Sequence, residues 1–157
     1  MRSHKNNAPA FLLILLCFQL QAHNSIEFRK LMYSKERKPS DTMKLKIAVG
    51  YSVFTATLQE NATTAAFKAM LPLTINMTEL NGNEKYYNLP GALPAKATAI
   101  GSIQAGDIML YGKNCLVLFY ENFNTSYHYT RLGRIINASG LAAALGNDNV
   151  TVQVELL

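Results

Sequence analysis

The stretch from Gly106 to Ile136 constrains the fold of this chain more than any other part of the sequence. It contains two short apolar segments, Asp107 to Tyr111 and Cys115 to Tyr120, separated by the turn residues Gly112-Lys113-Asn114. A connection this short requires the two segments to pair as antiparallel strands. Polar and apolar residues then alternate from Tyr127 to Ile136, which predicts a third strand. The stretch has no metal-ligand cluster, nucleophile elbow or phosphate-binding loop, so the sequence does not name a reaction.

Alternating segments elsewhere predict further strands. The segment Leu73–Leu80 runs directly into Asn81-Gly82, a dipeptide that favours the positive φ angles of a type I′ hairpin turn. Two prolines indicate an irregular loop from Tyr86 to Pro94, and a second loop is expected from Glu121 to Ser126. The other expected strands are Lys44–Val49, Ser52–Leu58 and Asn149–Leu156.

Two short helices complete the expected fold. The first begins at the capping residues Asn61–Thr64 and ends before Pro72, and the second is capped by Ser139 and ends at Gly146. Many short strands with few helices favour a closed antiparallel barrel, because closure removes exposed sheet edges. We therefore expect residues 43–157 to form one mainly β domain, a closed barrel of about eight strands with two short helices.

The first residues predict an exported protein. An unbroken apolar run from Ala10 to Phe18 follows the basic residues Arg2 and Lys5. The run is much shorter than the ~20 residues that cross a bilayer, so residues 1–22 are interpreted as a signal peptide, and no stable membrane span is expected. The mature protein would be periplasmic or secreted. Lipid anchoring at Cys17 is the less favoured alternative, because bulky residues precede that cysteine.

The formal net charge of +5 lies mainly ahead of the domain. Residues 23–42 carry a cluster of basic side chains and are interpreted as a solvated linker, with contact to a membrane surface as the alternative. From Met43 onward there are eight basic and seven acidic residues. Binding to DNA or RNA needs a clustered basic face, so no nucleic-acid partner is expected.

The candidate ligand-binding residues are Tyr120, Phe123, Tyr127 and Arg131. A regular strand would place Arg131 on the same side as Tyr127 and Tyr129. A guanidinium beside aromatic rings suits a carboxylate or carbonyl group attached to an apolar body. We therefore predict a groove for a peptide or a small acidic ligand. In the alternative interpretation, the tyrosines cover the barrel surface and Arg131 forms an exposed ion pair.

No catalytic residue, metal ion or cofactor is expected. His128 has no carboxylate at an obvious partner position, and His4 and His23 lie ahead of the domain, so local spacing assembles no metal site. Cys115 lies in an apolar strand and is expected to be a small buried hydrophobe. A reactive thiol is the alternative for this residue.

Ordered sequence blocks carry a family resemblance: Ala65–Leu73, Leu80–Tyr86, Leu89–Pro94, Ala105–Tyr111, Leu118–Tyr120 and Leu132–Ile135. In this order they resemble the small bacterial cyclophilin-like proteins, and the resemblance covers essentially Met43–Leu157. It implies a cyclophilin-type barrel of about eight strands capped by helices. The activity of that family is not established, and a shared fold does not guarantee a shared function.

Departures from known patterns bear on function. Members often have Tyr-x-Pro-Trp-Gly-Asn between the two middle strands, whereas this chain has Tyr111-Gly112-Lys113-Asn114 and no tryptophan. The Phe-His-Arg and Gln-Gly-Gly-Asp blocks of true prolyl isomerases are missing: the arginine of Tyr127–Arg131 is at another spacing, and Gln104–Asp107 has another context. We expect an exported binding domain without turnover. A peptidyl-prolyl cis-trans isomerase using Arg131 is the first alternative, and a structural or partner-docking domain is the second.

Overall fold

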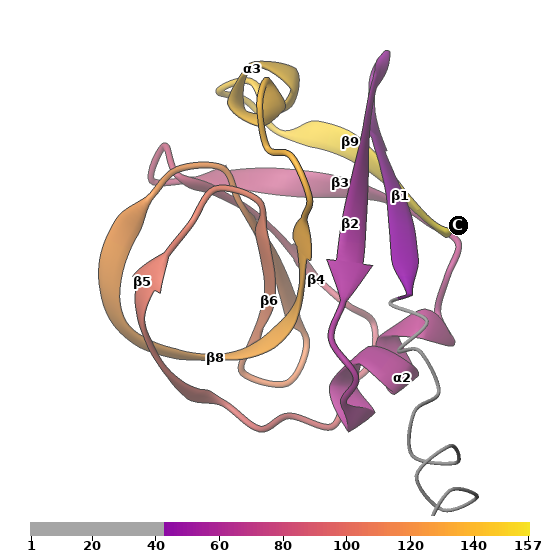
Figure 1. The fold of residues 1–157 in the computed structure, drawn as a ribbon, viewed down its shortest axis with the longest axis vertical. Helices are drawn as coiled ribbons and strands as arrows, with labels where there is room; N and C mark the ends of the chain where they lie inside the picture. The colour runs from indigo at the N-terminus through magenta and orange to yellow at the C-terminus, as the bar shows by residue number, and fades with distance from the viewer. Residues whose placement is uncertain (1–42) are drawn as a thin grey trace, which may run out of the picture. The chain divides into compact units, whose positions relative to one another are not determined.

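Nine strands and two helices make up the part of the chain that the computed structural model describes, residues 43–157 (Figure 1). The expected signal peptide, 1–22, and the expected linker, 23–42, lie outside the described residues. In chain order the elements are β1 (Lys44–Val49), β2 (Ser52–Leu58), α2 (Ala62–Lys68), β3 (Leu73–Leu80), β4 (Glu84–Asn88), β5 (Thr98–Ile103), β6 (Asp107–Tyr111), β7 (Cys115–Phe119), β8 (Phe123–Ile135), α3 (Leu141–Leu145) and β9 (Val150–Leu156).

All nine strands belong to one antiparallel sheet with the order β2-β1-β9-β3-β4-β7-β6-β8-β5. β8 also pairs with β2, so the sheet closes on itself. The closed ring contains every strand except β5, that is, eight of the nine. β5 is attached to the ring through its pairing with β8. The expected closed antiparallel barrel with two short helices is therefore confirmed.

Local sequence signals account for several of these elements. Asn81 and Gly82 have φ angles of 59° and 70°, and the Asn83 N–H donates to the Leu80 carbonyl at 3.3 Å, as a type I′ turn requires. Asn61 caps α2, because its Oδ1 accepts a hydrogen bond from the Thr64 N–H at 2.8 Å. These two predictions are confirmed.

Other boundaries differ from the sequence-based expectation because long-range pairing decides them. The expected loop from Tyr86 begins as a strand, since β4 finds a partner in β7. The expected loop from Glu121 to Ser126 is largely part of β8, which pairs with the unforeseen strand β5. α3 is preceded by Gly140 in the left-handed region, without the expected Ser139 cap. Within residues 43–157, neither helix has the length and apolar character needed to cross a membrane.

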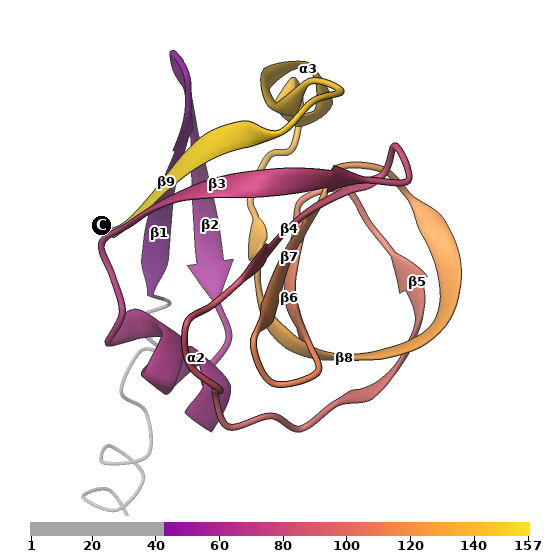
Figure 2. The same ribbon diagram turned by 180° about the vertical axis from the view of Figure 1, so that it is seen from behind.

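Two hydrophobic cores share the strands β6 and β7. The barrel core lies inside the ring and receives Ile108 and Leu110 from β6. The second core lies against the opposite face of these strands, since Met109 of β6 alternates with the two residues just named. It consists of Ile103, Met109, Val117, Phe119 and Tyr129. Figures 1 and 2 show β8 as a long arc that, together with β5, curves around this second region.

Candidate functional site

A pocket of about 460 Å³ opens between the β3–β4 turn and the first half of β8. Its floor includes Val117 and Tyr129, so it lies directly on the second core. We call it the aromatic pocket. It is lined by Leu80, Asn81, Asn83, Glu84, Tyr86, Tyr111, Cys115, Val117, Phe123, Asn124, Thr125, Ser126, Tyr127 and Tyr129.

Aromatic rings from three strands form the apolar surface of this pocket. The ring of Tyr111, at the end of β6, lies 5.5 Å from that of Tyr129 and 6.0 Å from that of Tyr127 in an edge-to-face arrangement. Tyr127 is 61% exposed, Tyr111 47% and Leu80 40%. Large apolar side chains left open to water around a hollow are typical of a binding surface.

Glu84 gives the aromatic pocket its charge. Among the described residues that line it there is no lysine, arginine or aspartate. Burial, together with repulsion from Glu79, raises the pKa of Glu84. Burial and then Glu84 raise the pKa of the Cys115 thiol, and they raise that of Tyr129 to about 12. The thiol therefore stays protonated at neutral pH, which argues against a nucleophilic role.

Asn83, which also lines the aromatic pocket, has an unsatisfied side-chain oxygen. This oxygen is buried and has no hydrogen-bond partner among the described residues, although buried polar atoms are normally bonded. Since this oxygen is closed to solvent, Glu84 is the side-chain acceptor next to it that a ligand N–H group would meet.

The structure brings together two of the four candidate residues, Phe123 and Tyr127, both of which line the aromatic pocket. Tyr120 lies on the other face, in the barrel core, and its hydroxyl donates to the Glu79 carboxylate at 2.8 Å. Burial and the bond to Glu79 raise the pKa of Tyr120 to about 12. Arg131 does not line the aromatic pocket. The four residues therefore do not form one groove.

The place of Arg131 along β8 explains why it lies outside the aromatic pocket. Tyr111 pairs with Tyr129 and Met109 pairs with Arg131, so Arg131 keeps the side of β8 that the alternation predicted but lies further along the strand. A β-bulge follows, since Ile108 pairs with Gly133 and Leu132 is an extra residue that turns into the barrel core. The register therefore agrees with the expected side of Arg131, but Arg131 does not line the pocket that holds Tyr127.

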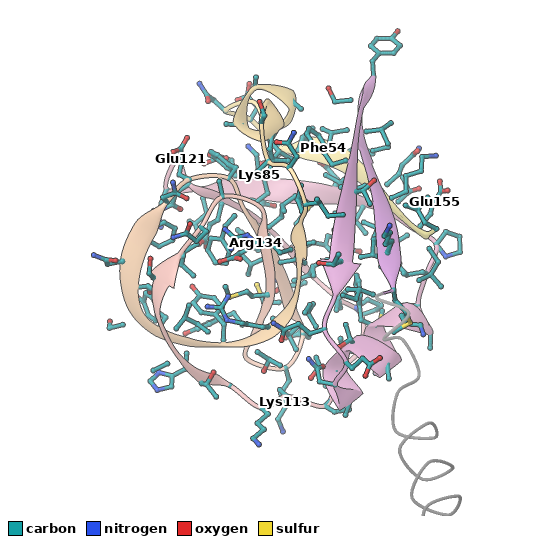
Figure 3. The ribbon with its side chains drawn as sticks, viewed as in Figure 1. Phe54, Lys85, Lys113, Glu121, Arg134 and Glu155 are labelled. Carbon is teal, nitrogen blue, oxygen red and sulfur yellow. The ribbon has the colours of Figure 1, made fainter. Side chains whose placement is uncertain are left out.

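Arg131 instead shares a buried carboxylate with Arg134. Asp107 is 1% exposed. Its Oδ2 lies 3.6 Å from the Arg131 Nη1, and its Oδ1 lies 3.6 Å from the Nε of Arg134, which is labelled in Figure 3. The Gln104 N–H also donates to Asp107, at 3.0 Å. A hollow of about 410 Å³ lies beside the two arginines. Both guanidinium groups remain partly exposed, so one carboxylate holds two cations at the protein surface.

Comparison with known proteins places this fold. A model of the cyclophilin-like family matches residues 47–155, which is most of the sequence. The chain belongs to the cyclophilin-like family. This cyclophilin-like domain is similar to the solution structure of the hypothetical protein AF2241 from Archaeoglobus fulgidus, with a TM-score of 0.53 and 20% identity, over 76% of this chain and 98% of that chain. At this identity the likeness shows the fold alone. No curated protein matched the sequence.

Sequence reasoning missed several residues of the pocket in this cyclophilin-like domain. Tyr86, Tyr111 and Glu84 were assigned to a loop, a strand and a hairpin, with no role in binding. They become neighbours because β4 pairs with β7, a pairing that no local pattern reveals, and β7 forms the expected antiparallel pair with β6. His128 is exposed. Within residues 43–157, no group of three potential ligands is placed to hold a metal ion.

Proposed function

We propose that this cyclophilin-like domain is an exported binding module that holds a peptide segment in the aromatic pocket and releases it chemically unchanged. The observation that carries the proposal is the cluster of exposed apolar side chains around the pocket, above all Tyr111 and Tyr127. A soluble domain gains nothing in stability from leaving such rings in water, whereas a bound peptide would cover them.

The charge of the pocket favours a peptide over an acidic ligand at this place. Glu84 is the one charged side chain among the described residues that line the pocket. Its carboxylate is a hydrogen-bond acceptor, so it suits backbone N–H groups, an amide or a lysine side chain. A ligand carboxylate would be repelled by Glu84 and would meet no cation among these described lining residues.

The test is selection from a phage-displayed library of random heptapeptides against the full chain, followed by measurement of dissociation constants for the enriched peptides. Replacing Tyr127→Ala should weaken their binding about tenfold, because exposed aromatic anchors carry much of the energy of such interfaces. Tyr51→Ala is the matched control, since this tyrosine is fully exposed but does not line the pocket. Failure to enrich any peptide, or equal affinity in the Tyr127→Ala variant, rejects the proposal.

A second candidate, binding of a small acidic ligand, is favoured by the pair Arg131 and Arg134. Two guanidinium groups face a single carboxylate, that of Asp107, at distances longer than a hydrogen bond, and a hollow lies next to them. An incoming carboxylate would complete the charge balance with bidentate bonds. Titration with succinate should show binding that Arg134→Gln weakens about tenfold; binding of succinate that is equal in both proteins removes this candidate.

An isomerase and a docking domain are the two remaining alternatives to the proposed binding function. Arg131, the electrophilic group of the isomerase alternative, pairs with Asp107 and lies outside the aromatic pocket. No observation on the described residues therefore favours isomerisation. A proline-peptide assay in which the full chain accelerates the uncatalysed exchange, which takes tens to hundreds of seconds, would replace binding by catalysis.

Export is supported by the N-terminal sequence, with a basic start and a short apolar run in residues 1–22. A mature N-terminus close to residue 23, found by sequencing protein recovered outside the cytoplasm, is the expected result. Recovery of the uncleaved chain inside the cell would reject export.

A further inference from the structure

β8 has a free edge along its first half. From Phe123 to Tyr129 it pairs with β5, and from Tyr129 to Arg134 it pairs with β6. Tyr129 pairs with both strands, so β5 and β6 lie on opposite edges of β8. On the β6 side, no strand of residues 43–157 pairs with the stretch from Phe123 to His128. We call this stretch the free β8 edge.

The free β8 edge borders the aromatic pocket. Consecutive residues from Phe123 to Tyr127 line the pocket on this side, and residues of the β3–β4 hairpin line it on the other. The edge therefore faces a hollow with a second wall, made by the same domain. A bounded hollow of this kind suits one added strand better than the sheet of another folded domain.

The free β8 edge lacks the charged and proline residues that often protect a strand edge. Proteins shield such edges with lysine, proline, inward-pointing charges or β-bulges. The sequence Phe-Asn-Thr-Ser-Tyr-His of residues 123–128 contains neither proline nor lysine, and no acidic residue. One backbone donor is satisfied locally, since the Tyr127 N–H bonds to the Thr125 hydroxyl oxygen at 3.1 Å. A bulge in the pairing with β5 opposes Ser126 and Tyr127 to the single residue Ile100, which bends the edge at the pocket.

We propose that an extended segment of a partner protein adds to the free β8 edge as a further strand of the sheet. This inference rests on the proposed function and states how the peptide is held. Backbone hydrogen bonds to β8 supply sequence-independent affinity, and every second side chain of the peptide points into the pocket. The chemistry of the pocket selects peptides with an apolar or aromatic side chain against Tyr111 and Tyr127, and a lysine or arginine two positions away that reaches Glu84.

Hydrogen exchange of the full chain, with the heptapeptide selected above, tests this mode of binding. The amide protons between Asn124 and His128 that point away from β5 should exchange at least about tenfold more slowly with the peptide bound, because new backbone bonds protect them. A version of the peptide N-methylated at alternate amides keeps every side chain but cannot form the ladder. It should bind at least about tenfold more weakly when the methylated amides are those facing β8. When the other alternate amides, which face away from β8, are methylated, the affinity should change little.

The outcomes separate the two proposals. Strand addition is overturned, while the proposed function stands, if three results are found together. Binding depends on Tyr127, it tolerates N-methylation of either alternate set of peptide amides, and the exchange of Asn124–His128 is unchanged. Failure to enrich any peptide overturns both. A concentration-dependent dimer of the full chain that Tyr127→Ala dissociates would assign the edge to a second copy and would overturn the peptide mode.

Discussion

At Gly133 the backbones of β2 and β8 come so close that no side chain fits between them. A Cβ atom at this position would lie 2.1 Å from the Thr57 carbonyl oxygen. Gly133 pairs with Leu58 at the place where β8 meets β2 and the ring closes. The absence of a side chain at one residue therefore permits closure of the barrel.

We expect Gly133→Ala to destabilise the domain by about 3 kcal/mol, because the two strands must move apart to accept the methyl group. Urea denaturation of the full chain measures the change. Gly91→Ala is the matched control, since nothing lies within 4 Å of a Cβ at Gly91 and its φ angle is not in the left-handed region. Equal stability of the two variants would show that β2 and β8 approach less closely than described.

At the scale of elements, a buried lysine joins the β3–β4 hairpin to the segment between α3 and β9 (Figure 3). Lys85 is 0% exposed; its ammonium donates to the Glu79 carboxylate, to the Gly146 carbonyl at 2.8 Å and to the Asp148 carbonyl at 2.7 Å. All three of its donors are thus used. The Tyr120 hydroxyl bonds to the same carboxylate, which completes a polar cluster beneath the hairpin.

This cluster should make stability depend on pH through Glu79. Burial alone would raise the pKa of Glu79, but hydrogen bonds from Lys85, Tyr120 and the Gly82 N–H outweigh it and hold the pKa below the ordinary value of 4.5. A lowered pKa stabilises the folded state above the ordinary value, and this contribution is lost as the pH falls through the folded-state pKa.

Glu79→Gln should therefore lower the free energy of unfolding by a constant amount from pH 7 down to pH 5, and by progressively less below about pH 4.5. Urea denaturation at a series of pH values measures the difference. Glu155→Gln is the control, because the Glu155 side chain is 46% exposed and its ion pair with Lys46 is 3.7 Å long. A difference between wild type and Glu79→Gln that is the same at all pH values would contradict the assigned hydrogen bonds.

At the scale of the whole molecule, the two cores depend on each other. β6 and β7 send alternate side chains into the barrel core and the second core. Neither core can lose these strands while the other keeps them. The domain should therefore unfold as one unit although its apolar residues form two clusters.

Leu110→Ala in the barrel core and Phe119→Ala in the second core should each lower the stability by about 3 kcal/mol, since both side chains are fully buried. Each variant should show one transition, with the same midpoint by far-UV circular dichroism and by tyrosine absorbance. Separate transitions in the Phe119→Ala variant would show that the second core unfolds independently.

Features that depend on neighbouring residues could be predicted from the amino-acid sequence alone. Alternation of polar and apolar side chains placed strands such as Lys44–Val49 and Leu73–Leu80 at their observed bounds, and Asn81-Gly82 fixed the hairpin turn between β3 and β4. The ordered blocks identified the cyclophilin-like family, and the many short strands indicated a closed barrel. Turn geometry and strand alternation are local properties, so they can be read without knowing which strands meet.

The grouping of side chains into one site, by contrast, follows from the pairing of strands in three dimensions. Arg131 lies beyond Tyr129 along β8 and pairs with Asp107 outside the aromatic pocket, and the pairing of β4 with β7 brings Glu84 and Tyr111 to one pocket. Bulges and strand neighbours are set by contacts between segments far apart in the sequence. For that reason the sequence identified the fold of this chain, while the aromatic pocket and the free β8 edge became visible only in three dimensions.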